Sequence, residues 1–524
     1  MCFASKILDF WKSPPKSERK EYFPYHLFTG VFILKPIITP HGVYQDFVIE
    51  QLQHHYSGGV LTLVHKDWPI ITKLWITDLT GIAVMLQDFY SVRGPAPRDP
   101  SAMLRSYLLF LLTNPEKGVT AWVDELYRVP LYAILSGFEP GDIPGVGTFY
   151  DFFARLWAAS DKNIKARKQK RKRKPKKGKK GEKAPTTTLG RIKRLVGWML
   201  NHMNDQKDLP MDRLFHFFQS QFLAVSARLG LLGNIDTIDI AGDGTPVVTA
   251  AYPRSKSTCN CHAQGLAKCN HPRIYSQPDC NSGWDSARER YFNGYHLYTL
   301  TASSSPYDLP LYPRLHPASR HDAVSFVVSS VEFSQRFTLG TVDKMLLDAA
   351  HDAGPIYDLL LHQNIEPFID LNVRGTKKTK TEMDIQISPD GIPICPNGKK
   401  MKHYGFDHSQ KRHKWRCPMM KKRTINTCKK LCSTAKYGRT FHTCSTDNPR
   451  LFPQTLRNSE KWKLIYRRRT TSERTNKREK IDYKLESGRH RSTKMWYIRI
   501  YAIMMCQHMD AWYAHQQKEL QRLK

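Results

Sequence analysis

The stretch IDTIDIAGDGT, residues 235–245, is the point at which the hydrophobic periodicity of the chain changes. Upstream of it, apolar residues recur at helical spacing, most regularly in residues 101–112, which follow Pro100. Downstream of it, short apolar runs alternate with helical segments, and residues 235–241 themselves predict a strand. The chain therefore changes here from an all-helical region to a mixed α/β region.

The elements expected downstream of this stretch follow one order. After the first strand, we expect strands at 295–302 and 309–316, a helix at 322–337, a strand at 345–347, a helix at 355–362, a strand at 366–370, and helices at 459–484 and from 492 to the end. Residues 375–457 interrupt the series, because they are basic, cysteine-bearing and rich in turn-forming residues. Without them the order is three strands, helix, strand, helix, strand, helix, which predicts an RNase H-like domain with a mixed sheet between helices.

The expected fold class is therefore α/β, with a mixed-sheet core, an inserted cysteine-bearing subdomain and an all-helical domain in front. The expected segments are an N-terminal extension (1–40), a helical N-terminal domain (41–160), a basic flexible linker (161–190), a helical connector (191–233), the first part of the core (234–374), the cysteine-bearing basic insertion (375–457) and the last part of the core (458–524). No role follows from the sequence for residues 1–40.

The net charge indicates a polyanionic partner. Lys and Arg outnumber Asp and Glu by 81 to 47, which gives a formal net charge of +34. Such an excess is typical of proteins that bind nucleic acid, and a membrane surface is the second candidate. The best apolar run near the N-terminus, residues 27–38, is broken by Lys35 and Pro36 and is shorter than a spanning helix of about 20 residues. It also lacks the layout of a secretory signal, so we expect a cytoplasmic protein without a membrane partner.

The densest basic run lies in the expected linker. Residues 162–183 contain fourteen Lys or Arg and one acid, Glu182, and they show no apolar periodicity. Such a run can be a solvated spacer, or it can be a non-specific clamp on DNA phosphates. The rest of the chain is basic too, which favours the clamp.

Two aspartates are expected where strands of the sheet end. Asp243 ends the first strand in IAGDGT, where the glycines allow close backbone approach, and Asp348 ends the fourth in MLLDAAHD. Clustered carboxylates bind hard divalent cations, and two such cations roughly 3.5–4 Å apart support chemistry on phosphodiesters.

Other acids compete for this role. Asp236 and Asp239 lie on the first strand, and Asp343 precedes the fourth. An acid inside a strand has less access to the carboxyl end of the sheet, so we prefer Asp243 and Asp348. Asp322 is interpreted as the N-cap of the following helix rather than as a ligand.

The helix expected after the insertion carries a third acid among basic and phenolic groups. Tyr466, Arg469, Glu473 and Lys480 stand at offsets 0, 3, 7 and 14. At about 100° per residue they fall within an arc of roughly 60° on one helix face. This face can be a surface salt-bridge network, which adds little stability. Turned toward two aspartates, it can instead supply a metal ligand with phosphate-binding neighbours.

The spacing Y-(2)-R-(3)-E-(6)-K resembles the signature of a large group of DDE transposases of bacterial insertion sequences, and the chain matches all four positions. The segments around Asp243 and Asp348 are similar to the two aspartate motifs of that group. RGPAPRDP (93–100) with the apolar helix after it, WDSAR (284–288) and YFNGY (291–295) also resemble segments of the group. The resemblance covers most of residues 85–485.

The resemblance implies an enzyme that hydrolyses DNA at the ends of a mobile element and then joins the freed 3′-hydroxyl to target DNA. Two divalent ions, magnesium or manganese, would be bound by Asp243, Asp348 and Glu473. The transposon-end DNA would be held by Tyr466, Arg469 and Lys480. The implied partners are double-stranded DNA of the terminal repeats and of the target, and a second copy of the chain in a synaptic complex. The helical domain is expected to bind DNA as well.

Two other functions are open. A DNA-binding protein derived from a transposase that no longer cuts DNA would keep the basic charge, although an intact acid triad argues against it. An RNA-binding protein with a basic linker would leave the acids unexplained.

Most of the eleven cysteines fall in two groups that can bind structural zinc or remain free thiols. The first group contains Cys259, Cys261, Cys269, His271 and Cys280, and the two possibilities weigh equally there. The second group, in the insertion, contains Cys395, Cys417, Cys428, Cys432 and Cys444. Zinc is favoured for the second group because the insertion has too few apolar residues for a core of its own. The preferred ligands are Cys395, Cys417, Cys432 and Cys444.

Overall fold

The computed structural model describes residues 35–57, 62–91, 96–158, 190–205, 207–251, 264–265, 280–286, 288–372, 381–382, 385–419, 432–435 and 437–523. Residues 1–34 and the basic run at 162–183 lie outside this part of the chain. So do Cys259, Cys261, Cys269, His271 and Cys428.

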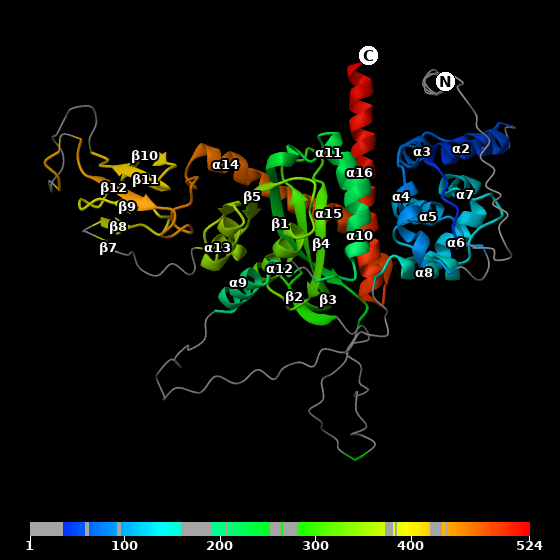
Figure 1. The fold of residues 1–524 in the computed structure, drawn as a ribbon, viewed down its shortest axis with the longest axis horizontal. Coiled ribbons are helices and arrows are strands. Elements are labelled where there is room, and N and C mark those ends of the chain that lie inside the picture. The colour runs from blue at the N-terminus through cyan, green and yellow to red at the C-terminus, as the bar shows by residue number, and fades with distance from the viewer. Residues whose placement is uncertain are drawn as a thin grey trace.

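The N-terminal region is helical in its described residues and packs around one buried helix (Figure 1). This central helix is α5 (Pro100–Thr113), which is buried from Pro100 to Leu111. It begins where Asp99 accepts a hydrogen bond from the Ser101 N–H at 2.9 Å, with proline in the first turn. The helices around it are α2 (His41–Tyr56), α3 (Asp67–Trp75), α4 (Thr80–Leu86), the 3-10 turn η1 (Gln87–Phe89), α6 (Val119–Arg128), α7 (Pro130–Ser136) and α8 (Val146–Arg155).

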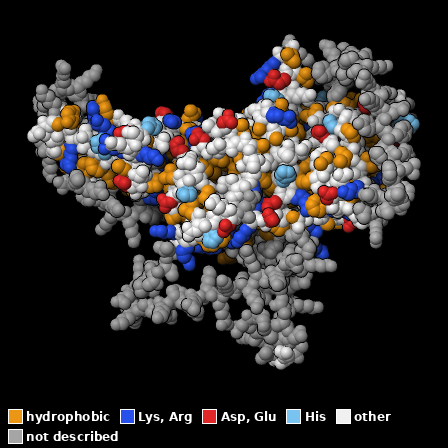
Figure 2. All heavy atoms as spheres, in the orientation of Figure 1, with side chains coloured by type: hydrophobic (Ala, Val, Ile, Leu, Met, Phe, Trp, Pro, Cys, Tyr) orange, Lys and Arg blue, Asp and Glu red, His pale blue; other side chains and the backbone are white. Residues whose placement is uncertain are grey.

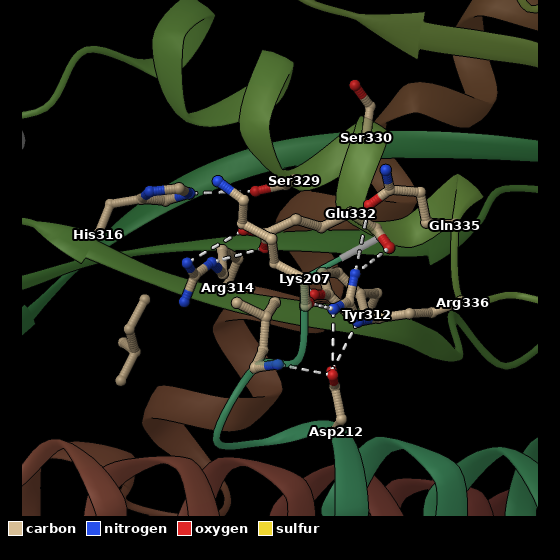
Figure 3. Close-up of polar contacts among 12 residues, drawn as sticks. Lys207, Asp212, Tyr312, Arg314, His316, Ser329, Ser330, Glu332, Gln335 and Arg336 are labelled. Atoms are coloured by element: carbon tan, nitrogen blue, oxygen red, sulfur yellow. Dashed lines mark hydrogen bonds and ion pairs between the residues drawn. The ribbon is translucent and has the colours of Figure 1, made fainter. Parts of the chain in front are cut away.

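A helical connector leads from this region to the sheet. It contains α9 (Arg191–Asn201), α10 (Asp212–Phe218), a π-helical turn (Gln219–Leu223) and α11 (Ala224–Arg228). Arg336 holds the connector against the core: its Nε donates to Asp212 at 2.6 Å and its Nη2 to the Lys207 carbonyl at 2.7 Å (Figure 3). Beside them, Arg314 pairs with Glu332 at 2.7 Å. These hydrogen-bonded pairs satisfy charges that would be costly to bury alone.

The central sheet is mixed and six-stranded. Its strands are β1 (Ile238–Val248), β2 (Asn281–Asp285), β3 (Arg290–Ala302), β4 (Pro310–Pro317), β5 (Val342–Leu347) and β6 (Glu366–Ile369). The order is β2-β3-β1-β5-β6, with β4 also paired to β3. β3 runs antiparallel to β1, β2 and β4, whereas β1–β5 and β5–β6 are parallel pairs. This mixed α/β region confirms the change of fold type expected at residue 234.

Two expectations for the strands need correction. Residues Ile235–Thr237 form a 3-10 turn, because the Asn234 side chain accepts from the Asp236 N–H, and the strand begins at Ile238. The strand then continues through Asp243 to Val248, since β3 is long enough to pair with it as far as Gly294. Asp243 therefore lies within a strand and not at its end. The short strand β2 was not expected, because its sequence NSGWD has no apolar run.

Helices cover both faces of the sheet. α12 (Asp322–Ser334) lies against one face, where His296 of β3 contacts Asp322 at 2.8 Å. On the other face, Asn476 of α15 (Thr470–Ile481) contacts Asp243. α14 (Glu460–Tyr466) packs against β1, β5 and β6 through Trp462 and Ile465, and α13 (Gly354–His362) precedes β6. Asp243 thus faces the helix that follows the insertion.

The last helix joins the sheet to the N-terminal region. α16 (Thr493–Arg522) is buried almost without interruption from Met495 to Trp512. One hydrophobic core includes its apolar residues, the inner residues of the sheet and those of α5. The helical region and the sheet are therefore packed together through α16, as Figure 1 shows on the right of the sheet.

The insertion forms small sheets at the opposite side of the molecule from the N-terminal helices (Figure 1). Its strands are β7 (Thr381–Glu382), β8 (Ile385–Ile387), β9 (Pro393–Ile394), β10 (Lys402–Asp407), β11 (Arg412–Arg416) and β12 (Thr440–Cys444). Ile385, Ile387, Met401 and Trp415 form a buried cluster there together with Cys395. The expectation that the insertion lacks apolar residues for a core is therefore wrong, since a few large side chains suffice for a small sheet pair.

No described helix is by itself long and apolar enough to cross a membrane; Asp67–Trp75 and Thr80–Phe89, bent by 51°, meet the criterion only as a pair. Figure 2 shows Lys and Arg side chains interspersed with acidic ones across the face in view. On that face the basic excess is not gathered in a single patch.

Candidate active site

Asp243 lies on the central strand, opposite Thr299 of β3. Its Oδ2 accepts a hydrogen bond from Asn476 Nδ2 of α15 at 3.0 Å. Burial, together with the nearby carboxylates of Asp322 and Asp348, raises the pKa of Asp243 to about 6. A bound cation would stabilise the ionised form of a carboxyl group in this environment.

Two glycines on β1 make room for the groups behind Asp243. A Cβ at Gly242 would come within 2.7 Å of the Tyr298 hydroxyl. A Cβ at Gly244 would come within 2.2 Å of Asp322 Oδ1 and 2.3 Å of His296 Nε2. The glycines in IAGDGT therefore permit close approach of these side chains, in agreement with the expectation from the sequence.

Asp348 follows β5, the parallel neighbour of β1, and caps the 3-10 turn η5 (Ala349–His351). Its Oδ1 lies 2.6 Å from His351 Nδ1, and His351 Nε2 lies 2.9 Å from the Tyr298 hydroxyl. Burial would raise the pKa of Asp348, but the hydrogen bond and charge of His351 lower it below the usual range. Asp348 is thus held as a carboxylate by a buried histidine.

A second histidine–aspartate pair adjoins the first. His296 Nε2 lies 2.8 Å from Asp322 Oδ1 at the first turn of α12. The N-cap of α12 is His321, whose Nδ1 accepts from the Ala323 N–H, so the interpretation of Asp322 as the N-cap is wrong. Asp322 is one residue too far along to cap, and its carboxylate turns toward His296 instead. It adds a third acid near Asp243.

The expected single helix at 459–484 is broken. The 3-10 turn η7 (Arg467–Arg469) separates α14 from α15. The hydroxyls of three successive residues bond back to the carbonyls of this turn, which favours a local break. Those residues are Thr470, Thr471 and Ser472. Tyr466, Arg469, Glu473 and Lys480 therefore do not share the face of one continuous helix.

Three of these four residues still lie together. Arg469 Nη2 donates to Glu473 Oε1 at 2.7 Å, and its guanidinium lies 6.0 Å from the Tyr466 ring centre. Burial raises the pKa of Tyr466, and the charges of Asp370 and Asp348 contribute to the rise. Lys480 is apart from them: its Nζ lies 3.6 Å from Glu486 Oε1.

The rival aspartates are engaged elsewhere. Asp239 pairs with Arg468 at 2.6 Å and with Lys344 at 3.2 Å. Asp343 also pairs with Lys344. Asp236 is exposed in the turn before β1. The carboxylates of Asp243 and Asp348, by contrast, lie close enough to each other for Asp348 to raise the pKa of Asp243.

A family model for the transposase DDE domain matches residues 243–507, just over half of the 524 residues. The chain belongs to the transposase DDE domain family. The matched range begins at Asp243 and includes Asp348 and Glu473. Transposases act on DNA, and the family therefore implies DNA binding. Comparison with curated proteins finds no match.

Several groups beside the acids of this transposase were not anticipated from its sequence. They are His296, Tyr298, His351 and Asn476. Glu479, on the same helix as Asn476, was not anticipated either. His351 follows Asp348 by three residues at a strand exit, a spacing that could have indicated it. Glu479 is fully buried, and burial raises its pKa to about 8. It is deeper than Glu473, whose side chain is half exposed.

The described residues contain no group of three His, Cys, Asp or Glu side chains positioned to hold a metal ion. The carboxylate oxygens of Asp243 and Asp348 are nevertheless suitable donors for a hard cation. Glu473 would have to leave Arg469 to join them. Its half-exposed side chain leaves space for that change.

The thiols of the insertion do not gather either. Cys395 is buried in the apolar cluster with Trp415, while Cys417, Cys432 and Cys444 are partly exposed. No three of the four lie in one group within the described residues, and Cys428 lies outside them. Zinc binding stays a prediction. Cys280, of the first group, is buried near the Gly294 carbonyl.

Asp243→Asn should stabilise the metal-free protein at pH 8. Because the pKa of Asp243 in the folded protein, about 6, exceeds the ordinary aspartate value of 3.8, ionisation opposes folding as pH rises between these values. The variant should gain roughly 2–3 kcal/mol in unfolding free energy above pH 6 and almost nothing below pH 4. Urea unfolding in EDTA at pH 4 and pH 8 measures this, with Asp343→Asn as a paired, partly exposed control. Equal stability of Asp243→Asn and the parent at pH 8 would contradict it.

Proposed function

We propose that the chain is an active DDE transposase, in which Asp243, Asp348 and Glu473 form the metal-binding triad for DNA end cleavage and strand transfer. The observation that best supports this is that Asp243 on β1 lies close enough to Asp348, after the parallel neighbour β5, for the two carboxylates to influence each other, and that Asp243 contacts the helix that carries Glu473. Asp243 and Asp348 are far apart in the sequence and are brought close together by the fold within the range that the family model matches.

An RNase H-like core is part of the proposal. Three antiparallel strands, β4, β3 and β1, are followed by the parallel strands β5 and β6, with helices on both faces. This agrees with the strand order expected for that fold. The insertion enters between β6 and α14, and it would be the cysteine-bearing subdomain of such a core.

Two magnesium or manganese ions would be held by Asp243 and Asp348, with Glu473 completing the set. Bound metals would activate the attacking oxygen and stabilise the leaving oxygen. The chain itself contributes positioning. His351 favours the ionised form of Asp348, and Asn476 orients the Asp243 carboxylate by donating to its Oδ2.

The Y-(2)-R-(3)-E-(6)-K signature suggests which residues hold the transposon end. Arg469 is the best placed of them, because it lies between Glu473 and Tyr466 and its charge also affects Asp243. On losing Glu473 to a metal, its guanidinium would be free for a DNA phosphate. Tyr466 and Lys480 would contact the same strand on either side.

The remaining partners follow from the reaction. Two ends must be brought together, so we propose a homodimer in a synaptic complex with terminal-repeat and target DNA. The helical region at 41–160 and the basic run at 162–183 would add DNA contacts outside the site. The second candidate is a transposase-derived DNA-binding protein without cleavage activity. A DNA cleavage assay distinguishes the two functions.

The deciding experiment uses the full chain and a duplex that carries the DNA flanking its own gene. With magnesium or manganese, we expect strand nicks at fixed positions and joined products with a supercoiled plasmid target; with EDTA, neither. Binding of the duplex without any cut in either metal would favour the DNA-binding protein. No binding at all would contradict both.

A further inference from the structure

A cavity of about 310 Å³ lies at the C-terminal end of β1, beyond Asp243. It is lined by Val248, Thr249, Ala250, Arg288, Arg290, Glu486, Arg489 and Trp496. Three arginines against one glutamate give this lining a net positive charge. The cavity is large enough for a small polar ligand group.

One arginine of the cavity is neutralised, and two are not. Arg288 lies 3.5 Å from both Asp285 and Glu486. Glu486 in turn accepts from the Val248 N–H at 3.1 Å and lies 3.6 Å from Lys480. Within the described part of the chain, Arg290 and Arg489 have no ion-pair partner.

The backbone around the arginines is held in unusual conformations. Arg489 has φ of 48°, and Glu289, between Arg288 and Arg290, also has φ of 48°. Non-glycine residues with positive φ are uncommon and cost free energy, so they persist where the surroundings require them. Here both turns bring arginine side chains to one cavity.

Trp496 is the most deeply buried residue of the cavity lining. This residue of α16 is fully buried yet lines the cavity, and its indole N–H has no acceptor among the described residues. A buried tryptophan N–H usually finds a hydrogen-bond partner, because leaving it unpaired is costly. This N–H is closed to solvent, so the arginines supply the ligand contacts of the cavity.

We propose that this arginine cavity binds a backbone phosphate of the DNA on which the transposase acts. The inference rests on the proposed function. Val248 is five residues beyond Asp243 on β1, roughly 17 Å along the strand. This corresponds to about five base pairs of duplex at 3.4 Å each, so one DNA segment can reach both the acids and the cavity. Lys480, beside Glu486, lies between them along α15.

The test removes both unpaired arginines in the full-length chain. Arg290→Gln is on an exposed strand end, and Arg489→Asn uses a residue that tolerates the left-handed backbone. The matched control, Arg228→Gln with Arg522→Gln, removes two exposed arginines far from the cavity in sequence. Thermal unfolding verifies that all proteins are folded.

Affinity is measured by fluorescence anisotropy with a 30-base-pair duplex of arbitrary sequence in 50–200 mM KCl. Loss of one phosphate contact should flatten the slope of log affinity against log salt by about 0.9, which is roughly eightfold in affinity at 0.1 M KCl. The control should lose clearly less. An equal loss in both double variants would overturn the proposal.

Inorganic phosphate distinguishes a free anion from DNA. If 10 mM phosphate raises the unfolding temperature of the parent but not of Arg290→Gln/Arg489→Asn, while both bind the duplex equally, the cavity serves a free anion and the DNA assignment is overturned. The proposed function fails differently, when the parent chain itself neither binds nor cuts DNA. If the parent binds and cuts DNA and the cavity variant does so equally well, only the proposal for the cavity is contradicted.

Discussion

Asp243→Asn, Asp348→Asn and Glu473→Gln should each reduce metal-dependent DNA cleavage by at least about 10³-fold, because phosphoryl transfer of this kind depends on positioned cations and little else. Each substitution keeps the shape of the side chain and removes one charged metal ligand. DNA affinity should stay within about threefold of the parent, since the phosphate contacts are made by cations elsewhere. Gel assays of nicking and strand transfer, with anisotropy in parallel, measure both quantities.

The controls for this prediction come from the same elements. Asp239→Asn and Asp343→Asn remove acids that are already paired with Arg468 or Lys344, so cleavage should survive in both. Glu479→Gln tests the alternative third acid on α15, which is buried and lacks a partner for either carboxylate oxygen in the described structure. Cleavage that persists in Glu473→Gln but is lost in Glu479→Gln would assign the third ligand to Glu479 of the same helix.

The order of the main strands could be predicted because buried strands give short apolar runs that need no tertiary information. Met345 to Leu347 is such a run, and it lies in β5. The edge strand β2 gives no run, since Trp284 is exposed and Gly283 packs against the Ala318 backbone. Its pairing depends on the length of β3, which local sequence does not reveal.

The residues of the candidate site also divide into those that local sequence predicts and those that depend on tertiary packing. Asp243 could be chosen from the sequence because glycines flank it, and Asp348 could be chosen because it follows a strand. The break at Arg467–Arg469 could not be foreseen from helical periodicity, because it depends on hydroxyls that bond back to the turn. Likewise His296 and Asp322 are adjacent only after β3 and α12 pack together, and Lys480 turns to Glu486 only because η8 (Leu485–Gly488) folds back beside it.

Arg499 should be among the most important residues for stability. It lies on α16 with no exposed surface, and its guanidinium donates to carbonyls of two separate regions. Within the turn after α15, the acceptors are Leu485 at 3.0 Å and Lys484 at 2.9 Å. In the N-terminal region, the acceptor is Pro115 at 2.6 Å. One side chain therefore ties the helical region to the end of the helix that carries Glu473.

Arg499→Met should lower the free energy of unfolding by about 3–5 kcal/mol. The methionine fills much of the volume, but it leaves the buried carbonyls of Leu485 and Tyr483 without this donor, and each unsatisfied group costs about 1–3 kcal/mol. Arg499→Lys should recover only part of this, because an ammonium cannot reach acceptors in a planar fork. Urea unfolding followed by tryptophan fluorescence measures the change, with the exposed Arg522→Met expected within about 0.5 kcal/mol of the parent. A loss below 1 kcal/mol in Arg499→Met would mean that water replaces the guanidinium, and the helical region would then be held to α16 by apolar packing alone.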